Sequence, residues 1–390
     1  MKTQADSLLE LRRFIVPEFV FGVGAIELIG QYAAKLGAKK VLLVTDSGVT
    51  NAGWVSVVEK SLQKSSLEFV VFDKVTPNPK DYEVMTGAEF YKKQHCDVIV
   101  AVGGGSPMDC AKGIGIVSTN NRSIINFKGV NEVTFPGPPL ICIPTTAGTS
   151  ADISQFDIIM DTLQKVKIAI ISKMVIPDVS LIDPQTTSTM PAELTAATGL
   201  DVLTHAIESY VSNASSPVTD LQALESIRLV SRNLLNAVER PNDIEVRTNM
   251  MLASLLAGLA FSNASLGMVH AMAHSLGGLL DLPHGECNAI LLEHVCAFNF
   301  KYVPERYRYI LQALGVETKS FSDSDVRTVL LETLSSLRES VGIKKRLSSM
   351  GLISEDIPLL AETAYKDPCL ATNPHPASVK EIIRCYKDAY

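Results

Sequence analysis

Hydrophobic residues follow two different patterns along the 390 residues of this chain. In the first half, short continuous apolar runs rich in Val, Ile and Leu alternate with helical stretches such as residues 54–65 and 81–95. The apolar runs are residues 39–46, 67–73, 97–105 and 139–146. Continuous apolar runs are typical of strands buried on both faces, and their alternation with helices predicts a parallel sheet covered by helices on both sides.

The pattern changes after residues 175–193, which are rich in Pro, Thr and Ser. From Pro191 onward, helical periodicity dominates up to the C-terminus. We therefore predict two domains, an α/β domain over residues 1–187 and an all-helical domain over residues 188–390. A chain of this length is long enough for each domain to have its own hydrophobic core.

Composition and charge narrow the class of protein. Apolar residues make up 46% of the chain and charged residues 20%, which is typical of a well-packed globular protein. A net charge of −7 and a pI near 5.6 argue against a nucleic acid or an anionic membrane as partner. The seven cysteines form no CxxC pair and several lie in apolar runs, which predicts reduced, mostly buried thiols in a cytoplasmic protein.

No segment of the sequence predicts export or membrane insertion. The first 14 residues contain no basic segment that leads into an apolar run, so we expect no signal peptide. The longest apolar stretch, residues 250–269, contains Ser and Asn and is followed directly by His270. These features favour a buried core helix over a membrane span.

One Asp and several His have a spacing that suits a metal site on packed helices. Asp201 and His205 are four residues apart, as are His270 and His274, and residues i and i+4 share one face of a helix. His284 follows ten residues after His274, in a predicted Pro–His–Gly turn. A single His on an apolar helix is usually a core residue. Two such pairs and a further His together favour a divalent metal with mixed N and O ligands.

These five candidate ligands exceed what a four-coordinate site needs. We assign the metal to Asp201, His205, His270 and His284, and we place His274 beside the open coordination position as a proton relay. A divalent cation at such a site lowers the pKa of a bound alcohol, so that the alkoxide can release hydride to a nicotinamide. His274 would then pass the proton to solvent.

A glycine-rich loop lies where the third predicted strand ends. Residues 103–115, GGGSPMDCAKGIG, follow that strand and open a helix. The three glycines allow close backbone approach, and the N–H groups at the helix start form an anion site that suits a pyrophosphate. We predict Ser106 as the N-cap, Pro107 as the first helical residue and Asp109 as the residue that closes a capping box. For Asp109 alone, capping is the better interpretation, although we keep it among the candidate cofactor residues.

Two further polar segments follow predicted strands. Asp46 ends the strand at residues 39–46, and a carboxylate there accepts hydrogen bonds from a ribose 2′-hydroxyl and repels a 2′-phosphate, which favours NAD over NADP. A turn-forming Asp in the TDSG segment is an alternative of nearly equal weight. Residues 144–152, PTTAGTSAD, carry hydroxyls and a glycine that suit contacts to a ribose or to a nicotinamide amide.

Together these motifs resemble those of the iron-containing (group III) alcohol dehydrogenases. The resemblance covers essentially the whole chain and includes FGVGAIELIG, GGGSPMDCAK, PTTAGTSAD, GLDVLTHAIESYVS, MVHAMAHSLGG, PHGECNAILLEHV and DPCLATNP. It implies a Rossmann-like dinucleotide-binding domain followed by an all-α metal-binding domain, an architecture shared with dehydroquinate synthases. It also implies NAD-dependent interconversion of alcohols and aldehydes.

The resemblance assigns roles to individual residues. It implies that the four ligands named above hold the metal and that His274 lies near the substrate. The cofactor residues that it implies are Asp46 for selection of NAD, Gly103, Gly104, Gly105 and Ser106 for the pyrophosphate, Thr145, Thr146 and Thr149 for the adenosine and nicotinamide, and Lys167. Phe156, Phe261 and Cys369 fall where the family lines its substrate pocket. Such a pocket is small and apolar, which favours short unbranched primary alcohols over diols or sugars.

The identity of the metal and three other functions stay open at this point. The resemblance favours Fe²⁺, whereas relative affinity favours Zn²⁺. One alternative is a glycerol or diol dehydrogenase, which needs a more polar pocket. A second is a lyase of the dehydroquinate synthase type, which uses NAD and a metal without net NADH. The Asp-x3-His pair and the PTTAGT segment favour the dehydrogenase over the lyase. A third is a sensor without turnover, which the complete ligand set disfavours.

One predicted strand bears on whether the chain forms oligomers. Residues 17–30 predict an edge strand that turns at Gly22 and Gly24 into a helix. A free strand edge can pair with a second chain. Together with the family resemblance, this predicts a homodimer or a larger homo-oligomer.

Overall fold

The computed structural model describes residues 13–390, which divide into two compact units. The α/β unit comprises Val16–Met190 and Asn242–Met251, and the helical unit comprises Pro191–Pro241 and Leu252–Tyr390 with the described residues up to Ile15. The predicted domain boundary near residue 187 stays a prediction. The segment on which the expectation of no signal peptide rests lies almost entirely outside the described residues.

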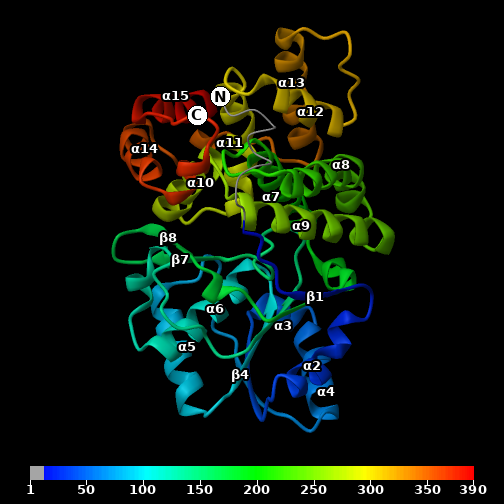
Figure 1. Ribbon diagram of the computed structural model, residues 1–390, viewed down its shortest axis with the longest axis vertical. Helices are drawn as coiled ribbons and strands as arrows, with labels where there is room; N and C mark the ends of the chain where they lie inside the picture. The colour runs from blue at the N-terminus through cyan, green and yellow to red at the C-terminus, as the bar shows by residue number, and fades with distance from the viewer. Residues whose placement is uncertain (1–12) are drawn as a thin grey trace. The chain divides into compact units, whose positions relative to one another are not determined.

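The α/β unit is built on a six-stranded sheet in the order β1-β9-β6-β4-β2-β3, in which all paired strands are parallel. The strands are β1 (Glu18–Phe21), β2 (Lys40–Val44), β3 (Glu68–Phe72), β4 (Val98–Gly103), β6 (Leu140–Pro144) and β9 (Val179–Ile182). Helices α2 (Ile29–Lys35) and α4 (Trp54–Lys64) lie on one side of β4, and α5 (Asp81–Lys93) and α6 (Gly105–Asn120) lie on the other (Figure 1). This confirms the predicted parallel sheet with helices on both faces.

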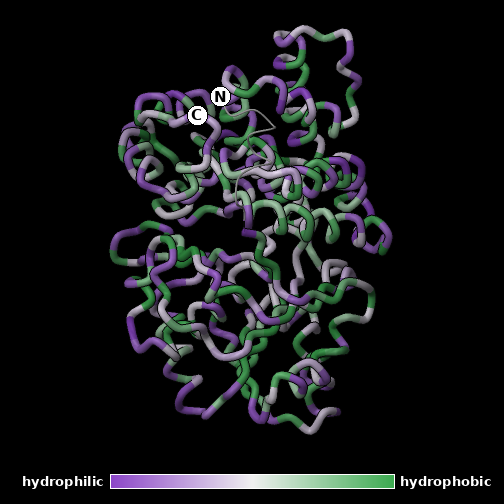
Figure 2. Tube along the Cα trace, viewed as in Figure 1, coloured by the Kyte–Doolittle hydropathy of each residue, from purple (hydrophilic) through white to green (hydrophobic). Residues whose placement is uncertain are grey.

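Alternate residues of the central strands belong to two separate hydrophobic cores. Val41 and Leu43 of β2 pack in the core that contains α2 and α4, whereas Leu42 and Val44 pack in the core that contains α5 and α6. Successive side chains of a strand point to opposite faces of the sheet, so a strand between two helical layers needs an apolar residue at every position. Figure 2 shows the central strands in the colour of hydrophobic residues.

β1 lies at one edge of the sheet, as predicted, and pairs with β9. The chain leaves β1 through Gly22 and Gly24, whose φ angles of 147° and 93° lie in the region that glycine adopts readily. The Asp183 carboxylate accepts the N–H groups of Gly24 at 2.8 Å and of Ile26 at 3.3 Å. This contact joins the turn after β1 to the end of β9.

Two features of the α/β unit were not predicted. β9 lies in the segment rich in Pro, Thr and Ser, and its four residues are too few to show a periodicity. An antiparallel hairpin of β7 (Phe156–Asp161) and β8 (Val166–Ile171) forms a second sheet with β5 (Gly129–Val130). The Asp161 carboxylate closes the hairpin because it accepts the N–H groups of Leu163 and Gln164.

The helical unit surrounds one central helix. Its helices are α7 (Ala192–Val211), α8 (Pro217–Glu239), most of α9 (Ile244–Ala264), α10 (Met268–Leu280), α11 (His284–Asn299), α12 (Pro304–Ala313), α13 (Asp323–Ser340), α14 (Ile357–Tyr365) and α15 (Val379–Ala389). Every residue of α7 from Thr195 to Val211 is buried. Polar side chains on α7 therefore need partners inside the protein.

Among the described residues, α9 is the helix whose length and apolar composition also suit a membrane span. In the structure, 67% of its most apolar window is buried within the protein. A core helix passes the same test of length and composition, which agrees with the buried helix predicted from the sequence.

Candidate metal centre and cofactor loop

The carboxylate of Asp201 lies among three imidazole rings in the helical unit. Its Oδ1 atom is 3.7 Å from Nε2 of His270, 3.8 Å from Nε2 of His205 and 3.9 Å from Nε2 of His284. The side chain of His284 is 24% exposed, whereas the other three are almost fully buried. The structure thus brings together the four residues that the sequence assigned to one metal.

Three helices supply this group. α7 carries Asp201 and His205 one turn apart, as their i, i+4 spacing predicts, and α10 carries His270. Because α7 is buried along most of its length, the side chains of Asp201 and His205 face other helices rather than solvent. α11 carries His284. The four side chains therefore meet only because α7, α10 and α11 pack together.

The position of His284 differs from the prediction. The expected Pro–His–Gly turn is wrong, because His284 is the first residue of α11, with Pro283 as the N-cap. Gly285 continues the helix for a packing reason. A Cβ atom at Gly285 would lie 2.4 Å from the backbone oxygen of Ala197. The glycine therefore allows α11 to approach α7 closely.

The electrostatics of the group follow from buried charges of opposite sign. Burial by itself would raise the pKa of the Asp201 carboxyl, but the imidazoles of His205, His284 and His270 outweigh it and hold that pKa far below its usual range. Burial lowers the pKa of His270, but the carboxylates of Asp201 and Glu208 outweigh it and raise that pKa to about 9. A site that favours positive charge around one carboxylate also suits a cation.

The donor atoms fit a divalent metal in type and in their spacing from Asp201. Ligands about 2.1 Å from a tetrahedral metal lie roughly 3.4 Å from one another. The distances of 3.7–3.9 Å from Asp201 Oδ1 to three Nε2 atoms are close to that spacing. Donor atoms of Asp201, His270 and His284 all lie within 4.8 Å of one another. One carboxylate oxygen and three imidazole nitrogens suit Fe²⁺ or Zn²⁺.

Asn288 touches this group and was missing from the sequence-based set. It is fully buried, and its Nδ2 atom lies 2.6 Å from Oδ1 of Asp201 and 3.1 Å from Nε2 of both His270 and His284. The amide therefore donates to the Asp201 carboxylate and contacts the imidazole rings of both His270 and His284. Its spacing of four residues from His284 was the signal available in the sequence.

Glu208 is a second neighbour that sequence reasoning missed. Its Oε2 atom lies 2.6 Å from Nδ1 of His270, on the ring edge opposite to the nitrogen that faces Asp201. Glu208 follows Asp201 by seven residues and shares its face of α7. The spacing places the carboxylate on the correct face, but only the fold shows that α10 packs there.

His274 lies beside the metal group and has its own carboxylate partner. Its ring stacks on that of His284, with centroids 5.3 Å apart and planes 15° apart. Its Nδ1 atom is 2.9 Å from Oδ2 of Asp367, whose Oδ1 accepts the N–H of Cys369 at 2.8 Å. Burial by itself would raise the pKa of Asp367, but His274 and the hydrogen bonds lower it below its usual range. Asp367 therefore acts as a fixed acceptor for His274.

Two of the three predicted pocket residues lie close to this chemistry. The ring of Phe261 stacks on that of His205, with centroids 4.4 Å apart. Cys369 is fully buried, and burial raises the pKa of its thiol well above the usual range, so the thiol is neutral. Phe156 lies on β7 of the α/β unit, where it is buried.

The glycine loop and the PTTAGTSAD segment meet in the α/β unit. They follow β4 and β6, which are neighbours in the sheet. A Cβ atom at Gly104 would lie 3.2 Å from the side chain of Thr146, and one at Gly105 would lie 2.9 Å from that of Thr149. The glycines therefore let the loop after β4 pack closely against the threonine side chains that follow β6. A phosphate-binding loop needs such close approach of the backbone.

The helix after the glycine loop begins earlier than predicted. α6 starts at Gly105, with Gly104 as the N-cap and without a side-chain cap, so the predicted capping box of Ser106 and Asp109 is wrong. Gly103 has a φ of 154°, which lets the chain turn from β4 directly into the helix. No capping side chain competes with a ligand for the N–H groups of the first turn.

Asp109 lies beside a buried lysine. Its Oδ1 atom is 4.0 Å from Nζ of Lys112, which donates to the backbone oxygens of Ser154 and Phe156 at 3.0 and 2.6 Å. Burial raises the pKa of Asp109 to about 7 and raises that of Asp157 well above its usual range. These surroundings favour a structural role for Asp109, in joining α6 to β7.

The remaining predicted cofactor residues also lie in the α/β unit. Asp46 is the N-cap of α3 (Ser47–Asn51), and its Oδ1 accepts the N–H of Val49 at 2.9 Å. Asp46 thus has the local structural role that was the alternative interpretation. Its role in selecting NAD stays a prediction. Thr145 donates its N–H to the carbonyl of Gly103 at 2.9 Å. Lys167 on β8 donates to Oδ1 of Asn78 at 2.7 Å.

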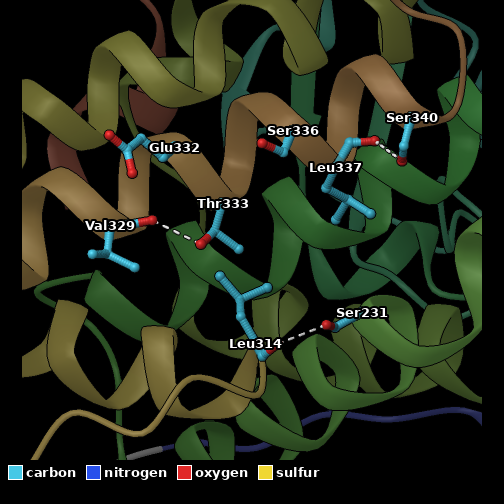
Figure 3. A pocket seen from close by; sticks show the side chains of 8 residues that line it. All are labelled: Ser231, Leu314, Val329, Glu332, Thr333, Ser336, Leu337 and Ser340. Atoms are coloured by element: carbon cyan, nitrogen blue, oxygen red, sulfur yellow. Dashed lines mark hydrogen bonds between the residues drawn. The ribbon is translucent and has the colours of Figure 1, made fainter.

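A groove of about 440 Å³ lies elsewhere in the helical unit, between α8 and α13 (Figure 3). Three of its hydroxyls donate to nearby backbone oxygens: Ser231 to Leu314, Thr333 to Val329 and Ser340 to Leu337. Glu332 is the one charged residue in its lining. It holds no group of metal ligands or bases, so we do not assign the chemistry to it.

Comparison with known proteins agrees with the fold. The sequence profile of the iron-containing alcohol dehydrogenases matches residues 17–184, and that of the C-terminal region of the Fe-containing alcohol dehydrogenase family matches residues 195–390. The 1,3-propanediol dehydrogenase of Citrobacter freundii is 43% identical over 97% of this chain and 98% of its own length. The NAD-dependent methanol dehydrogenase of Bacillus methanolicus is 39% identical over 96% and 99%.

A solved structure shows the same architecture. The crystal structure of a 1,3-propanediol oxidoreductase superposes with a TM-score of 0.94 at 41% identity, over 98% of this chain and 100% of the other. A parallel sheet with a glycine loop, together with a helical unit in which Asp201 meets three His, suits a metal-dependent oxidoreductase. The chain belongs to the iron-containing alcohol dehydrogenase family. It is an oxidoreductase that acts on CH–OH groups.

The contacts of Asn288 lead to a prediction about the metal-free protein. Replacement by Leu, which has a similar shape, removes the N–H group that donates to the buried carboxylate of Asp201. We expect Asn288→Leu to lower the unfolding free energy of the metal-free protein by about 2 kcal/mol, because a buried charged acceptor loses a partner. Urea unfolding of chelator-treated protein measures this.

The matched control is Asn236→Leu, on the outer surface of α8, where the amide donates to the backbone oxygen of Arg232 in the same helix. This change should alter the unfolding free energy by less than about 0.5 kcal/mol. Equal effects of the two substitutions would show that the contacts of Asn288 with the candidate ligands carry no special stability.

Proposed function

We propose that this enzyme interconverts short primary alcohols and their aldehydes, with NAD as hydride carrier and Fe²⁺ or Zn²⁺ as its metal. One observation carries the proposal: Oδ1 of Asp201 faces Nε2 of His205, His270 and His284 within 3.9 Å. A group of this composition inside a helical core has no packing advantage over apolar residues, so its chemistry must account for it. Family membership supplies the reaction class.

The two cofactors and the chain have separate tasks. When bound, the cation acts as a Lewis acid toward the alcohol oxygen, and the nicotinamide accepts the hydride. Asp201, His205, His270 and His284 hold the cation. We propose that the glycine loop of Gly103, Gly104, Gly105 and Ser106 holds the pyrophosphate of NAD, and that Asp46, Thr145, Thr146, Thr149 and Lys167 contact the rest of the cofactor. The absence of side chains at Gly104 and Gly105, where a Cβ atom would meet Thr146 and Thr149, supports this role.

His274 is the group we assign to proton transfer. Its Nδ1 donates to the Asp367 carboxylate, so Nε2 is the nitrogen that can accept the proton of an alcohol. The stacking of its ring on His284 keeps it beside the metal ligands. In the reverse direction, the same nitrogen returns the proton to the product oxygen.

The side chains near the ligands favour a small apolar substrate. The ring of Phe261 covers His205, and the neutral thiol of Cys369 adjoins Asp367. Neither group offers a strong partner for a second hydroxyl, which favours simple primary alcohols. A 1,3-diol is the second candidate, because a 1,3-propanediol dehydrogenase shares 43% of its residues with this chain.

The first test is NADH formation by metal-free protein reloaded with Fe²⁺ or with Zn²⁺. Substrates are the primary alcohols from ethanol to hexanol, 1,3-propanediol, a 1,2-diol and glycerol. We expect steady NADH production with one metal and an optimum among the short primary alcohols. A preference for diols over all simple alcohols would decide for the second candidate. Tight NAD binding without net NADH from any alcohol, with either metal, would contradict the proposal.

A matched pair of His variants tests the ligand set in the same assay. His205→Ala removes a candidate ligand and should abolish metal-dependent turnover. His375→Ala is the control, since its ring stacks on Tyr302 with centroids 3.6 Å apart and has no contact with the ligand group among those described. The control should keep activity and metal content.

The hydrogen-bonded pair of His274 and Asp367 leads to a further prediction. In Asp367→Asn, the amide can donate to Nδ1 of His274 and so reverse which ring nitrogen carries the proton. We expect kcat to fall about 100-fold, the size typical of general acid–base catalysis, with the bound metal unchanged. The pH profile of kcat should change shape as well. Asp356→Asn, at the start of α14, is the surface control. A loss of metal in Asp367→Asn would contradict the assignment.

We also propose a homodimer or larger homo-oligomer, as the family resemblance implies, and a cytoplasmic location. The edge position of β1 supports the first, and the seven free, buried cysteines support the second. Phe19 on β1 is 39% exposed, so an apolar side chain stands on that edge strand. Light scattering should give at least twice the mass of one chain, and a monomer at working concentration would contradict this proposal.

A further inference from the structure

Glu208 connects the central helix of the helical unit to the start of α10. Asp201, His205 and Glu208 are spaced i, i+4 and i+7 along α7, so all three lie on one face of that helix. The Glu208 side chain is only 4% exposed. Its Oε2 atom lies 2.6 Å from Nδ1 of His270, which is the distance of a strong, charge-assisted hydrogen bond.

The same carboxylate also caps α10. Oε1 accepts the N–H of Val269 at 2.6 Å, and Oε2 lies 3.4 Å from the N–H of His270. Backbone N–H groups are obligatory donors, so both oxygens must act as acceptors here. The N-terminus of a helix also favours a negative charge. Glu208 therefore receives three donor groups from two consecutive residues of α10.

The residue before α10 makes this arrangement possible. Gly267 is the N-cap of α10 and has no side chain with which to cap it. A Cβ atom at Gly267 would lie 2.8 Å from Oε1 of Glu208 and 3.0 Å from Oδ1 of Asn373. The glycine leaves room for two capping side chains from elsewhere in the chain, and Asn373 accepts the N–H of Met268.

From these contacts we propose that Glu208 is a positioning residue that sets the affinity of the site for its divalent cation. An acceptor at Nδ1 makes that nitrogen the donor of the ring and leaves Nε2, which faces Asp201, to bind the cation. Because the carboxylate is held by the backbone of α10, it also fixes the angle of the ring. The inference rests on the proposed role of His270 as a ligand, and it adds a residue that does not itself contact the metal.

The test is Glu208→Gln, which keeps size and shape but replaces one acceptor oxygen by an N–H donor. That donor must face either the N–H groups of α10 or Nδ1 of His270, so one contact is lost in either orientation. We expect the affinity for Zn²⁺, measured by competition with a chelator, to fall about 10- to 100-fold. We also expect the zinc-loaded protein to lose the downfield ¹H NMR signal of the His270 Nδ1 hydrogen, identified by its absence in His270→Ala.

The control is Glu83→Gln in the α/β unit. Glu83 is also buried, and it accepts the N–H of Lys80 at 3.0 Å and the hydroxyl of Thr76 at 2.7 Å. It should lower stability without changing the affinity for Zn²⁺. If Glu208→Gln likewise lowers only the melting temperature of the metal-free protein, Glu208 is merely a cap and the proposal is overturned.

Two further variants keep the proposal distinct from the ligand assignment. His270→Ala should lose Zn²⁺ affinity more strongly than Glu208→Gln, and retained affinity there would show that the ligand set itself is wrong. Loss in His270→Ala with no loss in Glu208→Gln would overturn only the role of Glu208. If Glu208→Gln fails to fold, Gly267→Ala tests the same contact, because its methyl group displaces the Glu208 carboxylate without removing it. Unchanged Zn²⁺ affinity in Gly267→Ala would also count against the proposal.

Discussion

The helical unit depends on how one buried carboxylate is compensated. Asp201 lies on a helix whose residues are all buried from Thr195 onward, and a carboxylate in such a place is costly unless charges and hydrogen bonds surround it. His205, His270 and His284 supply the charges, and Asn288 supplies the hydrogen bond. Because these partners come from α7, α10 and α11, satisfying Asp201 requires the three helices to meet at one place.

Two histidines of the site are likewise paired with buried carboxylates. His270 needs an acceptor for its second nitrogen and finds Glu208, and His274 finds Asp367 in the same way. Each carboxylate also accepts backbone N–H groups, of Val269 for Glu208 and of Cys369 for Asp367. The orientation of each ring is therefore tied to the position of a helix or turn, and the geometry of the site is as rigid as the packing around it.

Local spacing explains why much of this was predictable. The apolar runs of the sheet and the i, i+4 pairs on α7 and α10 are properties of a few consecutive residues, and they identified the parallel sheet and the Asp and His residues that meet. The capping box at Ser106 was wrong for the opposite reason. A strand that ends in three glycines can enter a helix at once, and this depends on how Gly104 and Gly105 pack against Thr146 and Thr149.

What was missed depends on contacts between distant parts of the chain. Asp367 lies 93 residues after its partner, and β9 becomes a strand because β1 and β6 flank it. Glu208 shares a helix face with Asp201, yet a Glu on a helix is most often a solvated residue. The structure shows the reason for its burial, since Gly267 leaves room for its carboxylate at the start of α10. Glycines in such a site are informative, because they lie where a buried side chain from another part of the chain must fit.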